Sequence, residues 1–331
     1  FYKIYCVVYS IFIEKFFSSW RTTCKYDFIF HFFQFFLILC FFVMLSFPSE
    51  VFEGAKSGLL LWFLTVLPTL FPFLLISRLL LDSCACSLLN KLLAPVISRL
   101  FGISAQGSFA FIVGFLCGYP MGAKITADLF HARQISKAEA SYLLSFCNNT
   151  SPAFLIHYIV LGYFQNPRLI FPSVLILYGT PILLTFFFRI KKHFASSNTT
   201  DITSPFTISK IPSCSLDFCL MDSSEAIVKI GGYIILFSVI LNLLQKLPIS
   251  HPFYQLFLLP SLELTNGCAL LNKTITAQTI PLSFPIYYSL CMGHTAFGGW
   301  CALFQTGSMI NGSGLSLNSY ARKKLVTALV T

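Results

Sequence analysis

The sequence predicts an all-α polytopic membrane protein, and its composition, its uncharged stretches and the placement of its charges each support this fold class. Of the 331 residues, 56% are hydrophobic and 10% charged, whereas a soluble domain carries roughly 25% charged residues. Uncharged stretches of about twenty residues recur, enough to cross ~30 Å of hydrocarbon. The basic residues behind the net charge of +10 lie in short clusters between these stretches, as topology signals do. We therefore expect the lipid bilayer, and no nucleic acid, as a partner.

The apolar stretches organise the start of the chain. Residues 28–47 are uncharged and are predicted as the first transmembrane helix. The basic excess before them places residues 1–27 in the cytoplasm, although this extension without a starting Met is also consistent with an artefact of translation or of a fragment. Residues 48–56 would then be external. The second span, residues 57–77, is expected to kink at its two prolines, and residues 82–102 are typical of an interfacial helix.

The first candidate site is a break in the apolar pattern, within the expected re-entrant segment 103–124. Glycine and proline there make a continuous helix unfavourable, and irregular backbone at membrane depth is tolerated where it is buried in protein or lines a cavity. The following half-helix would direct its positive end, and a lysine, at a polar or anionic solute. An ordinary helix with a snorkelling lysine is the alternative. The candidate residues are Gly118, Tyr119, Pro120, Gly122 and Lys124.

Two further breaks follow. The polar run Asn148, Asn149, Thr150 and Ser151 ends at a proline, and polar side chains at membrane depth favour a cavity. Hydrogen bonding between packed helices is the alternative for this run. If one cavity holds both motifs, the Lys124 ammonium should lie within reach of the polar run. The third break contains Gly298 and Gly299.

Particular motifs resemble a known family. They are Phe47-Pro-Ser-Glu-Val51, Leu67-Pro-Thr-Leu-Phe-Pro-Phe73, Gly118-Tyr-Pro-Met-Gly-Ala-Lys124 and Ser145-Phe-Cys-Asn-Asn-Thr-Ser-Pro152. They are similar to the sporulation integral membrane proteins of YlbJ type, which carry nucleoside-recognition (Gate) domains, and the resemblance extends from about residue 28 to the C-terminus. It implies a multi-pass protein of the bacterial cell membrane linked to endospore formation, without a known substrate. Around the third break the family usually reads Gly-Leu-Ser-Val-His-Ala-Gln, so Gln305 matches while the serine and histidine do not.

The halves of the chain show signs of an internal repeat. Gly118 and Gly298 are 298 − 118 = 180 positions apart, and Ser136 and Ser316 share this offset, while Lys56 and Lys229 are related by 229 − 56 = 173. Inverted repeats with paired broken helices are a transporter architecture. The expected division is a first Gate-type repeat at 54–166, a transmembrane helix and cytoplasmic linker at 167–213, and a second inverted repeat at 214–331, incomplete at its C-terminus.

The motifs favour binding or transport over catalysis. Hydrolase, metalloprotease and phosphate-loop motifs are absent, and the twelve cysteines are scattered. We expect no enzyme activity, no cofactor and no metal site. All acidic residues are expected in loops or at span ends, which argues against a carboxylate proton relay. If coupling ions are used, Na⁺ held by the oxygens of 148–151 is easier to build. The leading hypothesis is a small polar solute bound near the midplane between the repeats. A structural or assembly protein of sporulation is the alternative, and homo-oligomerisation stays open.

Overall fold

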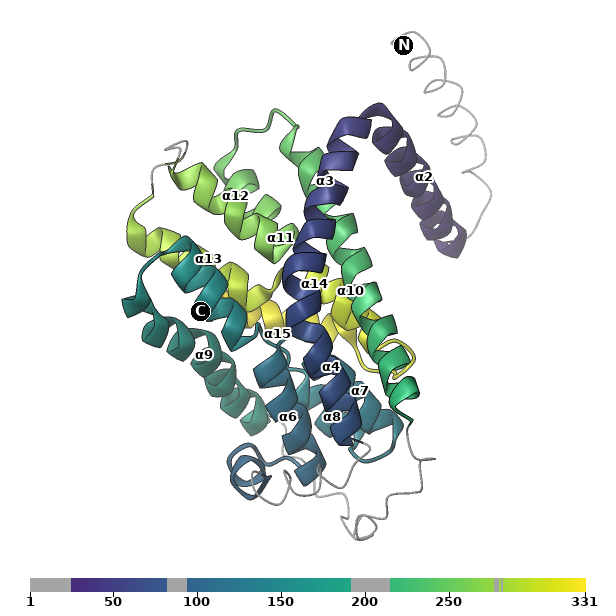
Figure 1. The fold of residues 1–331 in the computed structure, drawn as a ribbon, viewed down its shortest axis with the longest axis vertical. Helices are drawn as coiled ribbons and strands as arrows, with labels where there is room; N and C mark the ends of the chain where they lie inside the picture. Colours follow the sequence, from purple (N-terminus) through teal and green to yellow (C-terminus); the bar gives the residue numbers. More distant parts are fainter. Residues whose placement is uncertain (1–24, 82–93, 192–214, 277–279, 281) are drawn as a thin grey trace. The chain divides into compact units, whose positions relative to one another are not determined.

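The computed structural model of the chain consists of helices (Figure 1) and describes residues 25–81, 94–191, 215–276, 280 and 282–331; no strand occurs in these ranges. The elements are α2 (Lys25–Ser46), α3 (Pro48–Leu61), the π-helical turn η1 (Trp62–Val66), α4 (Leu67–Leu81), α6 (Ala105–Cys117), α7 (Met121–His131), α8 (Lys137–Leu143), the π-helix η2 (Phe154–Tyr163), the 3-10 turn η3 (Pro167–Leu169), α9 (Ile170–Lys191), α10 (Leu216–Gln245), the π-helical turn η4 (Tyr254–Leu258), α11 (Leu259–Leu262), α12 (Leu264–Thr276), α13 (Phe284–Phe297), α14 (Gly299–Met309) and α15 (Leu317–Val330).

The chain forms two compact units, one ending at Phe52 and one from Glu53 to Thr331. In the first unit, the apolar helix α2 coincides with the span expected at 28–47. The second unit contains every candidate site residue. The expected extension 1–27 and linker 195–213 fall almost wholly outside the described residues.

Helices of membrane-spanning length confirm the all-α polytopic class. Three helical ranges are long and apolar enough to cross a bilayer: Pro48–Leu80, Pro167–Phe186 and Leu216–Gln245. Ala94–Phe101 and Ala105–Cys117 would add a fourth if this pair, bent by 95°, forms one span. Large apolar side chains such as Leu64, Phe171 and Met221 are exposed on these helices. Exposed apolar side chains in such number suit contact with lipid.

The second span begins earlier than residue 57, where the sequence placed it. Residues 48–56, expected between the first two spans, are helical, because Pro48 begins α3 and the helix continues through η1 to the end of α4. A proline is compatible with the first helical turn, where its missing N–H costs no hydrogen bond. A π-helical turn, Trp62–Val66, lies just before Pro68, and the kink at the two prolines stays a prediction. In the second half, α10 is one continuous helix from Leu216 to Gln245.

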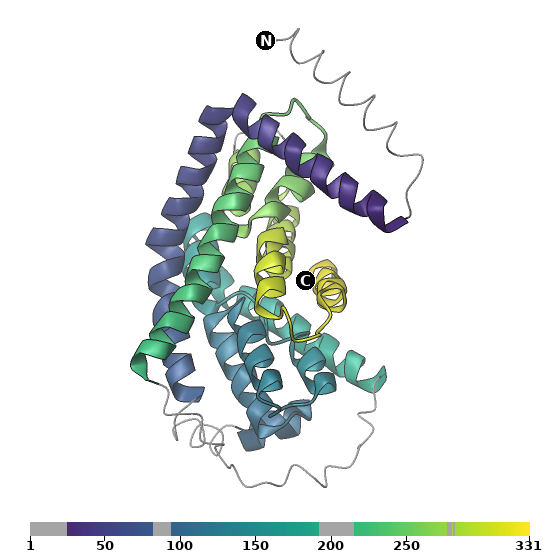
Figure 2. The ribbon, with the colours of Figure 1, turned by 90° about the vertical axis from the view of Figure 1, so that its right-hand side faces the viewer.

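From Glu53 onward, α3 and α4 pack antiparallel along α10 (Figure 2). Glycines allow close approach here: a Cβ atom added to Gly58 would lie 2.8 Å from the Ile235 Cα, and one added to Gly231 would lie 2.6 Å from the Trp62 ring. Small residues at four-residue spacing, as at Gly54 and Gly58, are typical of such membrane helix pairs. The Trp62 indole then donates to the α10 backbone at 3.0 Å.

These contacts have the symmetry of an inverted repeat. Under the offset of 173, Gly58 corresponds to Gly231 (58 + 173 = 231) and Trp62 corresponds to Ile235 (62 + 173 = 235). The contact of Gly58 with Ile235 therefore corresponds to the contact of Gly231 with Trp62. The offset thus exchanges the two helices of this packed pair. A two-fold axis between the helices would relate them in the same way. Because the two helices are antiparallel, their equivalence agrees with the inverted relation expected from sequence.

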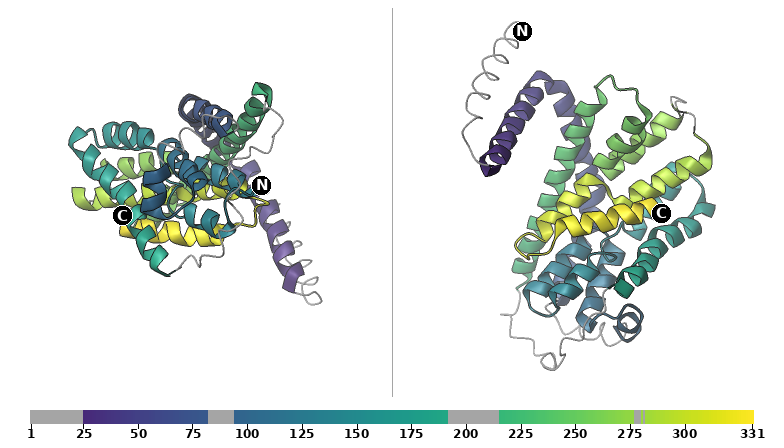
Figure 3. Two further views of the ribbon diagram at one scale, coloured as in Figure 1. Left: turned by 90° about the horizontal axis from the view of Figure 1, so that it is seen from below. Right: turned by 180° about the vertical axis from the view of Figure 1, so that it is seen from behind.

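Residues related by the offset of 180 also occupy equivalent positions in the helices of the two halves. Helix α6 ends at Cys117 and α13 at Phe297, 297 − 117 = 180 residues later. Ser136 caps α8 and Ser316 caps α15, each accepting the backbone N–H three residues on, at 3.1 and 3.2 Å. Both halves thus contain a broken helix, a loop and a serine-capped helix. In the second half α15 packs beside α13 (Figure 3).

Candidate functional site

The first break separates α6 from α7 at Gly118, Tyr119 and Pro120. Gly118 has φ +84°, a conformation that residues with a Cβ adopt at a cost. The sequence therefore predicted this break correctly. The α7 half-helix begins at Met121, so its N-terminal turn follows the proline directly.

A row of glycines lets residues 147–151, which contain the polar run, pack against this break. A Cβ atom on Gly114 or Gly122 would overlap the Cys147 carbonyl oxygen, and one on Gly118 would lie 2.6 Å from the Ser151 nitrogen. The Tyr119 N–H also donates to the Asn149 carbonyl at 2.7 Å. The structure thus brings the first two motifs together, because glycines at four-residue spacing leave one face of the broken helix open to the extended segment.

The polar run is hydrogen-bonded to the second half of the chain. The Asn148 amide donates to the hydroxyls of Thr306 and Tyr320, each at 2.9 Å. The Thr150 hydroxyl donates to the α13 backbone at 2.9 Å. Asn149 accepts a hydrogen bond from the buried Lys324 at 2.7 Å. Asn148 and Asn149 therefore hold the halves together, which is the alternative that the sequence left open for them.

The third break, at Gly298 and Gly299, meets the first. Both glycines have positive φ, +82° and +85°, and they separate α13 from α14. A Cβ atom on Gly298 would lie 3.1 Å from the Tyr119 ring. The two broken helices thus touch at their breaks, as inverted repeats around one central site require.

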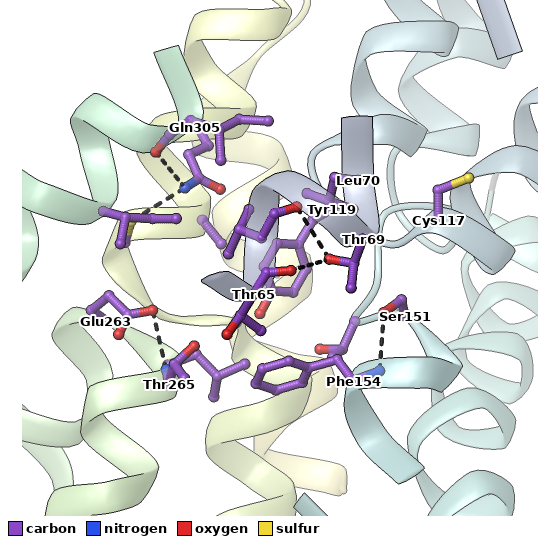
Figure 4. A pocket seen from close by; sticks show the side chains of 18 residues that line it. Thr65, Thr69, Leu70, Cys117, Tyr119, Ser151, Phe154, Glu263, Thr265 and Gln305 are labelled. Atoms are coloured by element: carbon purple, nitrogen blue, oxygen red, sulfur yellow. Dashed lines mark hydrogen bonds between the residues drawn. The ribbon is translucent and has the colours of Figure 1, made fainter. Parts of the chain in front are cut away.

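A cavity of about 90 Å³ lies where the breaks meet (Figure 4). Five of the twelve predicted site residues line it: Tyr119, Thr150, Ser151, Gly298 and Gln305. The other seven do not, although Gly118, Pro120, Gly122 and Gly299 shape the breaks beside it. Gln305 is buried, and its amide donates to the Ile230 carbonyl at 3.4 Å.

Sequence reasoning missed four polar residues of the lining: Thr65, Thr69, Glu263 and Thr265. Thr65 lies in η1 and Thr69 one turn later in α4, on either side of Pro68 in the sequence, and polar residues at this spacing in an apolar span were a usable signal. Thr69 directs its hydroxyl back to the Thr65 carbonyl at 2.6 Å.

Glu263 corrects the expectation that every acidic residue lies in a loop or at a span end. It has extended backbone between α11 and α12 and is 5% exposed. Its carboxylate accepts the N–H groups of Thr265 at 3.1 Å and of Asn266 at 2.7 Å. A fourth break thus places a buried carboxylate on the cavity wall.

Lys124 does not lie where the sequence suggested. Its ammonium is 3.0 Å from Asp222 on α10 and 3.4 Å from Asp128 on α7, and Arg78 on α4 completes the cluster at 3.7 and 3.8 Å from the same two aspartates. A lysine within the apolar part of the protein needs compensating partners, and these carboxylates supply them instead of the polar run. Lys124 therefore fastens α7 to α4 and α10.

Comparison with known proteins places this geometry in context. A family model described as nucleoside recognition (Gate) matches residues 63–165, a range that includes the first break, the polar run and both cavity threonines. The sporulation integral membrane protein YlbJ of Bacillus subtilis (strain 168) is 30% identical, over 76% of this chain and 72% of YlbJ. No solved structure matches the chain.

Proposed function

Because the chain belongs to the family of the sporulation integral membrane protein YlbJ, we propose that it acts in endospore formation, in the bacterial cell membrane, by binding and moving a small polar solute through the cavity between its breaks. The observation that carries this proposal is the lining itself. Residues from both halves, including both glycine breaks, surround one space. Breaks in paired helices that converge on a cavity are the arrangement of transporter sites.

The depth of the cavity supports the proposal. Helix α10 has 30 residues and is therefore about 45 Å long. Its cavity residues Ile230 and Ile234 follow Leu216 by 14 and 18 positions, which places them roughly 21–27 Å from that end. A helix that crosses the bilayer would thus hold the cavity near the midplane. The volume of about 90 Å³ is below the roughly 300–1,000 Å³ of pockets for drug-sized ligands, so a small solute fits this conformation.

A structural or assembly role in sporulation is the second candidate. Its support is the set of hydrogen bonds by which Asn148 and Asn149 join the halves, since firm attachment suits a scaffold. The two candidates differ in whether they need the cavity. Only transport or binding requires it to be open.

Filling the cavity distinguishes them. Thr65→Phe places an aromatic ring in the cavity, whereas Leu64→Phe places the same side chain on an exposed position one residue away. Both variants and the unchanged chain are expressed in a Bacillus subtilis strain lacking YlbJ, and heat-resistant spores and membrane levels are measured. We expect Thr65→Phe to lose most of the spores that the other two restore, at equal membrane levels. Normal spore numbers with Thr65→Phe would favour the assembly role.

A further inference from the structure

The cavity has a charged wall. Among the described residues that line it, Glu263 is the one with a charged side chain. The anionic solute suggested by the position of Lys124 in the sequence therefore has no cation to meet there, because Lys124 pairs with aspartates elsewhere. The one lining side chain that can carry a charge near neutral pH is thus acidic.

Among the described residues, no basic side chain pairs with this carboxylate. In the part of the chain that the structure describes, no lysine, arginine or histidine nitrogen lies within 4.0 Å of the Glu263 carboxylate. Its two oxygens each accept one backbone N–H from α12, and an ionised carboxylate has about four acceptor positions. A buried charge is costly unless it is paired. Capping α12 needs an acceptor oxygen but no full charge, so the cap alone does not account for a glutamate here.

The rest of the lining suits a cation. The side-chain oxygens of Thr65, Thr265 and Ser151 join the carboxylate, and Figure 4 shows Glu263 and Thr265 on one wall with Ser151 across from them. Ser151 accepts the Phe154 N–H at 3.2 Å and keeps a second lone pair. Tyr119 and Phe154 add aromatic rings, whose faces attract cations.

A single carboxylate favours a monovalent over a divalent ion. Divalent hard cations are held by several oxygen ligands with more than one carboxylate in typical sites, and the described residues contain no group of three or more His, Cys, Asp or Glu side chains that could hold a metal ion. The volume of about 90 Å³ has room for an ion with a few waters, each of which needs ~10–15 Å³ by this measure, or for a small ammonium compound.

We propose that the cavity binds a monovalent cation against the Glu263 carboxylate, either a free alkali ion or the ammonium group of a small organic solute. This inference rests on the proposed solute-binding function and names the chemical class that the site takes. It replaces the anionic solute expected from sequence.

The test is cation-dependent thermal stability of the full chain in lipid nanodiscs. Choline chloride, which is bulkier and lacks N–H groups, is replaced stepwise by NaCl, KCl or methylammonium chloride at constant ionic strength. A ligand at ten times its dissociation constant should raise the melting temperature by roughly 2–4 °C. An effect of Na⁺ or K⁺ identifies a free ion as the occupant, and an effect of methylammonium alone identifies an ammonium group.

Variants tie the effect to the site. Glu263→Gln should abolish the shift, while Glu53→Gln, at an exposed position of α3, should keep it. If Glu263→Gln does not fold, Thr65→Val serves in its place and should weaken the apparent affinity several-fold. The inference is overturned by equal shifts in Glu263→Gln and the unchanged chain, by a Thr65→Val protein with unchanged affinity, or by no shift with any of the three cations. Spores lost with Thr65→Phe together with no cation effect would retain solute binding and reject the cation.

Discussion

Replacing Gly118 by alanine is expected to destabilise the protein by roughly 2–6 kcal/mol. Two costs contribute. Gly118 has φ +84° and ψ −174°, a region adopted almost only by glycine, where a residue with a Cβ loses roughly 1–3 kcal/mol. The added Cβ would also lie 2.6 Å from the Ser151 nitrogen, and overpacking of this kind costs typically 1–3 kcal/mol. The clash is with backbone, so rotation of a side chain cannot relieve it.

Gly232→Ala is the matched control. It makes the same chemical change in the middle of α10, where an added Cβ meets nothing within 4 Å. Alanine in a helix interior is favoured over glycine by roughly 0.5–1 kcal/mol, so this variant should be neutral or slightly stabilised. Thermal unfolding of both purified variants in one detergent measures the difference, and Gly118→Ala should melt at least about 5 °C lower.

The result also bears on the site. If Gly118→Ala is as stable as Gly232→Ala, Gly118 is not held at a positive φ against Ser151. The segment would then be an ordinary helix, and the break could not position Tyr119 at the cavity.

Two further predictions concern Lys124 and the topology. Lys124→Met leaves Asp128 and Asp222 to share Arg78. It should lower the free energy of unfolding by roughly 1–2 kcal/mol, a small value because the cluster is partly exposed. In thermal unfolding, adding Asp222→Asn should recover part of this loss, and no recovery would argue against a coupled cluster. A cysteine placed at Ser197 in a cysteine-free chain should not react with a membrane-impermeant thiol reagent added to intact cells. The reason is that the basic cluster at the end of α9 predicts a cytoplasmic loop. Labelling of this cysteine would refute the inverted orientation.

The breaks were predictable because their causes are local. Gly118 and Gly298 interrupt apolar stretches, and glycine at positive φ needs no distant partner to be recognised. The start of α3 was missed for a related reason. Pro48 followed by Ser and Glu50 is typical of a loop but equally of a helix N-terminus, and nothing local decides between the two.

The partners of charged residues were not predictable. Lys124 was assigned to the polar run because that run is the nearest dense source of oxygens in the same half. In the structure, the lysine that donates to Asn149 is Lys324, which is 324 − 124 = 200 positions from Lys124. Lys124 instead forms an ion pair with Asp222 in the other half. Such pairings depend on how the halves dock, and sequence spacing contains no measure of that.

The repeat accounts for where the cavity lies, and the differences between the halves account for its chemistry. Tyr119 corresponds to position 119 + 180 = 299, a glycine without a ring, and Gln305 corresponds to 305 − 180 = 125, a buried isoleucine. Both polar members of these pairs line the cavity. A solute there meets unlike groups from the two halves, so its recognition depends on positions where the repeat is broken, whereas the glycines shared at 118 and 298 maintain the breaks. Substitutions at Tyr119 and Gln305 should therefore alter which solute binds, and substitutions at the shared glycines should alter whether the site forms.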